Sequence, residues 1–329
     1  MPDRFLVIGS NSFSGATCVA CLLKDGAEVV GMSRSPEPSD VFLPYKWGPH
    51  DRFRFHQLDI NADLDRIMQV VDEFRPAYVI NFAAQSMVAQ SWEHPEHWFM
   101  TNTISMVGLH DRLRKCAFLE KYVQVSTPEV YGSTSGVIRE DAPLNPSTPY
   151  AVSKAACDMS LLTFVKAYEF PAVFTRAANV CGPGQQLYRI IPRAVLSILA
   201  REKLKLQGGG TSVRSFIHMR DVSAGTIAAA RRGPPGAIYH LSTDRRVSIR
   251  ELVELICAAM KVRFEDHVEV VGARLGQDSA YLLDSTRAGE ELGWKPAISL
   301  EDTVRETIDW MKANWDEIRS QPRDYMHKR

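Results

Sequence analysis

The sequence lacks an excess of charge of either sign. Its 329 residues include 39 lysines and arginines and 39 aspartates and glutamates, so the formal net charge is zero. A strongly basic surface that attracts nucleic acid or an anionic membrane is therefore not expected. The sequence also lacks any apolar run near the ~20 residues that a transmembrane helix needs. We therefore expect no nucleic-acid partner and no membrane partner.

Cysteine is scarce and scattered, with six residues in the whole chain. Cys18 and Cys21 are closely spaced, but no second pair follows, so neither a zinc site nor a disulfide framework is expected. We expect these two side chains to pack inside a helix. The first residues enter an apolar strand at once, which predicts no signal peptide. The expected location is a reducing cytoplasm.

Short apolar runs alternate with helical patterns in the first half of the chain. Strands are expected over 4–9, 27–33, 53–60, 77–84, 121–127 and 171–180, with helices over 16–26 and 63–74 between them. This alternation is typical of an α/β fold in which helices wind around a parallel sheet. The Pro-rich stretch 33–51 is expected to be a long loop.

The end of the first predicted strand carries a glycine turn, Gly9-Ser-Asn-Ser-Phe-Ser-Gly15. Such a turn before a helix can bind the pyrophosphate of a dinucleotide at the helix N-terminus. The middle glycine of the usual pattern is replaced by Ser12, so the match is degenerate. The predicted cofactor contacts in this turn are Gly9, Asn11, Ser12, Phe13 and Gly15.

The second predicted strand ends in Ser33 and Arg34, where an NAD site usually has an acidic residue for the ribose hydroxyls. A small residue followed by arginine suits a 2′-phosphate instead. The sequence therefore favours NADP as the cofactor, and NAD remains the alternative.

Two short motifs predict acid/base chemistry. The first, at 126–132, contains Thr127 and Glu129, and the second, at 150–154, contains Tyr150 and Lys154. Residues four apart lie on one face of a helix, so the lysine charge is expected to favour the phenolate of the tyrosine. Such a tyrosine can take a proton from a sugar hydroxyl while the attached carbon gives up a hydride.

Seven motifs together resemble the extended short-chain dehydrogenase/reductase family, and within it the nucleotide-sugar 4,6-dehydratases. They lie at 8–15, 81–92, 126–132, 150–154, 175–185, 213–222 and 291–296. The resemblance implies a Rossmann fold with a smaller C-terminal substrate-binding lobe. We expect an NAD(P)-binding domain over 1–181, a nucleotide-sugar lobe over 182–329, and a strand near 238–242 that rejoins the first domain.

The resemblance also implies a reaction and further site residues. A nucleotide-diphosphate hexose would be oxidised at carbon-4, lose water across carbons 5 and 6, and be reduced at carbon-6. Tyr150 would act as base at carbon-4, Thr127 would hold the carbon-4 oxygen, and Glu129 would remove the carbon-5 proton. Additional cofactor contacts would come from Asp59, Ile60 and Ala83, and substrate contacts from Ser86, Asn179, Arg189, Arg214 and Arg274.

The motifs depart from single family members at two places. Gln85 resembles the GDP-mannose enzymes, whereas Pro128 stands where the dTDP-glucose enzymes have an aspartate as general acid. Glu129 is therefore expected to act alone. A UDP-glucuronate decarboxylase, a sugar 4-epimerase and a non-catalytic dinucleotide-binding module remain alternatives. The nucleotide base is not readable from these motifs.

Two helical stretches, 99–113 and 155–168, are apolar around most of their circumference. A helix that is apolar all round must bury both faces. In the family the corresponding helices form a four-helix interface, so a homodimer is expected.

Overall fold

A seven-stranded sheet forms the centre of the molecule. The structure is a computed structural model that describes residues 2–133, 136–272 and 282–327. The strand order is β12-β7-β5-β4-β1-β2-β3, and every neighbouring pair is parallel. The bounds are β1 Arg4–Ile8, β2 Glu28–Ser33, β3 Phe53–Gln57, β4 Tyr78–Asn81, β5 Lys121–Val125, β7 Ala172–Ala177 and β12 Ile238–Leu241. The predicted α/β fold with a wound parallel sheet is confirmed.

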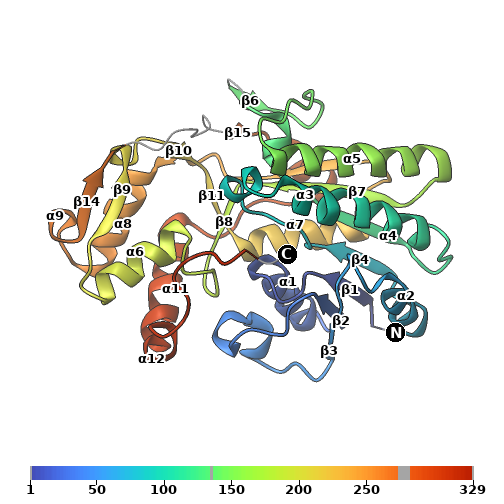
Figure 1. Cartoon of the computed structure of the whole chain (residues 1–329), viewed down its shortest axis with the longest axis horizontal. Coiled ribbons are helices and arrows are strands. Elements are labelled where there is room, and N and C mark those ends of the chain that lie inside the picture. The colour runs from blue at the N-terminus through green and yellow to red at the C-terminus, as the bar shows by residue number, and fades with distance from the viewer. Residues whose placement is uncertain (1, 134–135, 273–281, 328–329) are drawn as a thin grey trace.

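Helices cover both faces of this sheet (Figure 1). Successive strand residues point to opposite faces, so Phe5 and Val7 join one core while Leu6 and Ile8 join the other. The first core includes α1 Phe13–Lys24, α7 Met219–Arg232 and α10 Thr286–Leu292, and the second includes α2 Leu64–Phe74, α4 Ser105–Leu113 and α5 Pro149–Tyr168. Burial on both faces explains why β1, β2 and β4 are mostly apolar, whereas β3, at the edge of the sheet, is partly exposed and contains polar residues.

The last strand of the sheet arrives late in the chain. β12 pairs with β7 in parallel, with Ile238 opposite Phe174 and Leu241 opposite Ala177. The chain therefore leaves the sheet after β7 and returns to it more than fifty residues later, where the sequence predicted a returning strand.

A second group of elements packs around its own core, to the left of the central sheet in Figure 1. It contains α6 Ile190–Leu199, β9 Leu204–Gln207, α8 Ile249–Met260, α9 Phe264–His267, β14 Val268–Val271, α11 Leu300–Ala313 and α12 Trp315–Ile318. Short strand pairs connect the parts of the fold: β8 Asn179–Cys181 with β11 Phe216–His218, β10 Val213–Arg214 with β13 Val247–Ser248, and β6 Val137–Ile138 with β15 Leu282–Leu283.

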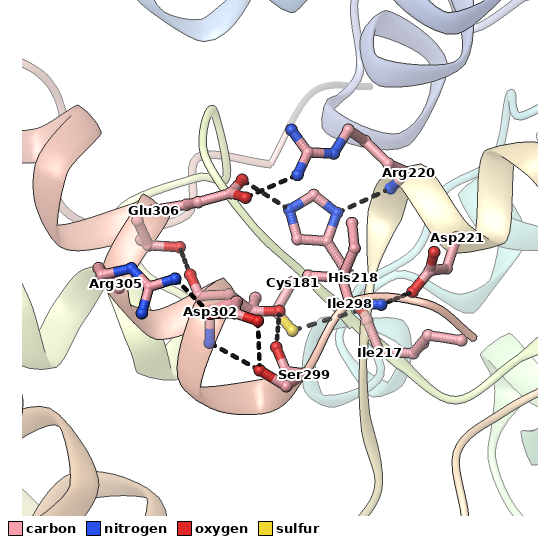
Figure 2. A network of polar contacts seen from close by, with 12 residues as sticks. Cys181, Ile217, His218, Arg220, Asp221, Ile298, Ser299, Asp302, Arg305 and Glu306 are labelled. Atoms are coloured by element: carbon pink, nitrogen blue, oxygen red, sulfur yellow. Dashed lines mark hydrogen bonds and ion pairs between the residues drawn. The ribbon is translucent and has the colours of Figure 1, made fainter.

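A polar network joins α11 to the start of α7 (Figure 2). Arg220 and Glu306 form an ion pair at 2.7 Å, and the buried His218 ring lies 3.4 Å from the same carboxylate. The carboxylate of Asp221 accepts hydrogen bonds from the backbone N–H groups of Ala297 and Ile298. The C-terminal elements are therefore fastened to the sheet domain by charge as well as by packing.

Three sequence expectations are corrected by the structure. The strand expected over 171–180 ends at Ala177, and the chain bends at residue 178 so that β8 pairs with β11 instead of the central sheet. The helix expected near 98–116 is divided into α3 Pro95–Phe99, a π-helical turn Met100–Ile104 and α4. The loop 33–51 contains two short 3-10 turns and buries Val41, Leu43 and Tyr45, so it packs as part of the core.

No helix in the described ranges is long and apolar enough to cross a membrane. In the same part of the chain, no group of histidine, cysteine, aspartate and glutamate side chains could hold a metal ion.

Candidate active site

The glycine turn between β1 and α1 leaves no room for a side chain at Gly9 or Gly15. Gly9 has a φ of +81°, and a Cβ added there would lie 2.8 Å from the backbone nitrogen of Ala83. A Cβ at Gly15 would lie 2.1 Å from the carbonyl oxygen of Gly9. The turn therefore brings the N-terminus of α1 close against the ends of β1 and β4, which is the arrangement that fits a dinucleotide pyrophosphate.

The structure explains why a serine, Ser12, can replace the middle glycine of the usual pattern. Its φ of −76° is ordinary for an L-residue, so the position needs no glycine. Its hydroxyl donates to the Gly9 carbonyl at 2.7 Å and accepts from the Gly15 N–H at 3.1 Å, which makes it the N-cap of α1. The serine thus stabilises the same turn that glycine forms in relatives with the usual pattern.

A cavity of about 170 Å³ extends from this turn along the carboxyl ends of β2, β3 and β4. Most of the predicted cofactor residues line it: Gly9, Asn11, Ser12, Ser33, Arg34, Asp59, Ile60 and Ala83. The Ser33 hydroxyl accepts from the backbone N–H of Asn11 at 3.2 Å, which ties the end of β2 to the glycine turn. The size and position of this cavity fit the adenosine half of a dinucleotide.

A larger cavity of about 680 Å³ begins at the glycine turn and continues between the sheet and the C-terminal lobe. All four predicted catalytic residues, Thr127, Glu129, Tyr150 and Lys154, line it together. Phe13 and the predicted substrate residues Ser86, Asn179, Arg189 and Arg214 line it as well. Gly15 belongs to the turn itself, and Arg274 lies outside the described residues.

Tyr150 and Lys154 lie in the first turns of α5. The helix begins with Thr148 as N-cap, whose side chain accepts from the Ala151 N–H at 3.1 Å, and Pro149 occupies the first helical position. The side chains of Tyr150 and Lys154 are buried, and the Lys154 ammonium donates to the carbonyl oxygen of Val125 at 2.8 Å. This bond fixes the lysine beside the end of β5.

Burial changes the protonation behaviour of this pair. It raises the pKa of Tyr150, the negative charge of Glu129 raises it further, and a hydrogen bond with Thr127 opposes the shift. Burial also lowers the pKa of Lys154. Burial is the main cause of both shifts, so a positive charge in the cavity would favour the phenolate of Tyr150. The expected role of Lys154 in favouring the phenolate stays a prediction.

Thr127 and Glu129 are held by a short 3-10 turn, Pro128–Tyr131. The Thr127 hydroxyl accepts from the Glu129 N–H at 3.3 Å, and Pro128 occupies the first position of the turn. Proline suits that position because its missing N–H has no partner there in any case. Pro128 thus supports the turn that presents Glu129 but offers no proton of its own.

Several residues around the cavity had no recognisable signal in the sequence. Ser126, Gln186 and Tyr188 also line it. The ring of Tyr325, near the C-terminus, packs edge-on against Tyr188 with the centroids 5.7 Å apart. Burial raises the pKa of Tyr325, and the charges of Arg34 and Arg189 oppose that shift, so Tyr325 lies near residues that line both cavities.

A Rossmann sheet with a closed glycine turn and a buried Tyr-Lys pair at its carboxyl edge defines a nicotinamide-dependent enzyme of the short-chain dehydrogenase/reductase type. More narrowly, the chain belongs to the GDP-mannose 4,6 dehydratase family, because the sequence model of that family matches residues 6–307. The family resemblance expected from the motifs is confirmed.

Known sugar-nucleotide dehydratases are similar to this chain over almost its whole length. A dTDP-glucose 4,6-dehydratase from Streptomyces griseus is 33% identical over 326 residues, covering 94% of both chains. The human dTDP-D-glucose 4,6-dehydratase is 30% identical and covers 95% of this chain and 91% of its own. Among solved structures, the dTDP-glucose 4,6-dehydratase DesIV from Streptomyces venezuelae, with NAD bound, has a TM-score of 0.87 at 29% identity, covering 95% of this chain and 98% of its own.

A solved UDP-glucose 4-epimerase from Thermotoga maritima is also similar, with a TM-score of 0.86 at 25% identity, covering 95% of this chain and 99% of its own. The fold is therefore shared with epimerases. The nature of the reaction has to be argued from the residues of the site.

Proposed function

We propose that the protein is a nucleotide-sugar 4,6-dehydratase, which converts a nucleotide-diphosphate hexose into its 4-keto-6-deoxy product. The observation that carries this proposal is the meeting of Thr127, Glu129, Tyr150 and Lys154 in one cavity of about 680 Å³. The names of the similar proteins support it, because dehydratases of dTDP-glucose match almost the whole chain. Glu129 distinguishes the site from that expected for a 4-epimerase.

The bound nicotinamide would accept the hydride from carbon-4 of the sugar and return it to carbon-6, and in its oxidised form it would supply a positive charge. The glycine turn and the residues around the cavity of about 170 Å³ would hold the adenosine diphosphate part. Two solved dehydratases, from Streptomyces venezuelae and Bacillus anthracis, are bound to NAD, so NAD is the better supported cofactor. The choice of NADP, based on Arg34, stays a prediction.

Tyr150 would take the proton of the carbon-4 hydroxyl as the hydride leaves that carbon. Burial raises the pKa of this phenol, so a positive charge beside it in the cavity would favour its phenolate form. Thr127 is hydrogen-bonded to the same phenol and would orient the carbon-4 oxygen toward it. Lys154, fixed by Val125, would reach the ribose next to the nicotinamide.

Glu129 would perform both proton transfers of the water loss. The ketone at carbon-4 acidifies the carbon-5 proton, Glu129 removes it, and the same carboxyl group returns a proton to the departing carbon-6 hydroxyl. Pro128 has no side-chain proton to give, and the Tyr131 hydroxyl of the same turn is bonded to Arg176 and His240, so Glu129 is left as the general acid. Arg189 and Arg214, on the lobe side of the cavity, would bind the diphosphate.

The direct test is to incubate the purified protein with a panel of hexose and hexuronate nucleotides and to weigh the products by mass spectrometry. A product lighter by one water supports the dehydratase. Loss of carbon dioxide from a hexuronate nucleotide, without dehydration of any hexose nucleotide, would identify a decarboxylase. An isomer of unchanged mass would identify an epimerase.

We also propose that the protein is a homodimer formed through α5 and the neighbouring segment 95–113. Large apolar side chains on these helices are exposed, among them Met100, Ile104 and Met159, at 45%, 59% and 59%. Met100 and Ile104 are four residues apart and lie on one face. Pairing of these helices with those of a second copy would cover this apolar surface.

The compartment proposed is the cytoplasm. All six cysteines are unpaired in the structure, which fits a reducing environment.

A further inference from the structure

A buried ion pair lies directly behind the catalytic tyrosine and lysine. Asp158, one turn after Lys154 on α5, and Arg176, on β7, are 2.9 Å apart with side-chain exposures of 1% and 2%. The same carboxylate oxygen of Asp158 also accepts from the Ser126 hydroxyl at 2.6 Å. None of these three residues has a role in the proposed reaction.

Asp158 is connected to the catalytic residues in two ways. Through Ser126 it holds the end of β5, since Ser126 lines the large cavity and immediately precedes Thr127. Through space, its charge lies close to the Lys154 ammonium one helical turn away. Among the protein groups that act on Lys154, Cys157 and Asp158 favour the ammonium form and Arg176 disfavours it.

Negative charge is scarce in the buried region around Asp158. Asp158 forms an ion pair with Arg176 and also favours the ammonium form of Lys154 through its charge, and Arg176 donates a further hydrogen bond to the Tyr131 hydroxyl. That hydroxyl lies 2.7 Å from His240, whose pKa burial lowers to about 4, so the histidine adds no charge near neutral pH. A buried cation without a counter-charge tends to lose its proton.

We propose that Asp158 is a positioning residue for the acid/base machinery: it holds Ser126, and thereby the turn that carries Thr127 and Glu129, and it keeps Lys154 in its charged form. This inference rests on the proposed function in using Lys154 as part of that machinery. The groups facing Tyr150 are Glu129, Thr127, Arg189 and Asp158, so Asp158 is the one carboxylate that acts on both members of the Tyr-Lys pair.

The test compares Asp158→Asn, which keeps the shape but removes the charge, with Ser126→Ala, which keeps the charge but removes the hydrogen bond. The titration of Lys154 is followed by NMR in the cofactor-bound protein labelled with ¹³C-lysine, and its signal is assigned through its absence in Lys154→Met. Asp158→Asn should lower the pH at which Lys154 loses its proton by about one unit or more. Ser126→Ala should leave that pH unchanged.

With a hexose nucleotide that the wild type dehydrates, the alkaline limb of kcat against pH should shift by the same amount in Asp158→Asn. Ser126→Ala should lower kcat about fivefold, the effect of one ordinary hydrogen bond, without moving the limb. If Asp158→Asn fails to fold, Asp158→Asn combined with Arg176→Met removes both charges and should return the titration of Lys154 toward the wild-type value.

The proposal would be overturned if Lys154 titrated in Asp158→Asn at the same pH as in the wild type. It would also be overturned if the titration of Lys154 in the double variant shifted by about one unit or more, the shift expected for Asp158→Asn alone. The NMR measurement needs no turnover. It therefore separates a failure of this inference from a failure of the dehydratase assignment, which would appear as a wild type inactive on every nucleotide sugar.

Discussion

The backbone of the glycine turn packs tightly around Gly15, so the substitution Gly15→Ala is a quantitative test of the cofactor site. The added Cβ would lie 2.1 Å from the Gly9 carbonyl oxygen and 3.0 Å from the Cα of Ser10, both rigid backbone atoms. Side-chain rotation cannot relieve this contact, so the start of α1 has to move away from β1 by about 1 Å, an overpacking change that typically costs about 1–3 kcal/mol.

Two effects oppose each other in this variant. Alanine in a helix is favoured over glycine by about 0.5–1 kcal/mol, which is smaller than the overpacking cost. We therefore expect a net loss of roughly 1–2 kcal/mol in the free energy of unfolding. The displaced helix N-terminus should also lose at least one charge-assisted hydrogen bond to the pyrophosphate, which weakens cofactor binding about ten- to a hundredfold.

Urea denaturation and calorimetric titration with NAD and NADP measure the two losses separately. Gly48→Ala is the matched control, because a Cβ there meets nothing within 4 Å, and its unfolding free energy should stay within about 0.5 kcal/mol of the wild type. If Gly15→Ala behaved like Gly48→Ala in both measurements, the turn would not be the pyrophosphate site argued here.

Four further predictions concern catalysis, cofactor choice, assembly and acid stability. Glu129→Gln should still transfer hydride, seen as absorbance of the reduced nicotinamide, but should form no dehydrated product; near-normal product would place the base elsewhere. Arg34→Ala should weaken NADP about ten- to a hundredfold by calorimetry and NAD little; equal losses would reject a 2′-phosphate role. Met159→Glu should convert a dimer into a monomer by light scattering, and a monomeric wild type would contradict the interface. Burial lowers the pKa of His110 to about 3, whereas an unfolded imidazole titrates near ~6.5. The unfolded chain then binds more protons between these values, so His110 should lower the stability as the pH drops below about 6.5, by up to about 1.4 kcal/mol per pH unit. In urea titrations, His110→Leu should reduce the slope by this contribution, while the contributions of His218 and His240, whose pKa values burial lowers to about 4, should remain.

Features with a local cause could be predicted from the sequence. The central strands are short apolar runs bounded by turn residues, so each was expected within a few residues of its observed place, and Tyr150 and Lys154 share a cavity because helical spacing puts them on one face. The sequence shows that Ser12 replaces the middle glycine, but it does not explain why the replacement is possible. Only the backbone φ angle of −76° shows that this position tolerates a side chain.

Features that depend on distant segments could not be predicted. Asp158 and Arg176 are unremarkable charged residues in a helix and a strand until the sheet brings them together. The π-helical turn Met100–Ile104 depends on Asn102, whose amide bonds the backbone of Gln85 and the hydroxyl of Ser153. The raised pKa of Tyr150 could not be predicted, because it is set mainly by burial, which a spacing pattern does not report.

The late arrival of β12 has a consequence for how the protein is made. The hydrogen-bonding edge of β7 that β12 covers stays open while the ribosome adds the residues between Ala177 and Ile238. At about 5–20 residues per second, this interval lasts several seconds. An unpaired apolar strand edge readily binds other unfinished chains. We therefore expect nascent chains truncated between β7 and β12 to aggregate, whereas chains that extend past Leu241 can close the sheet.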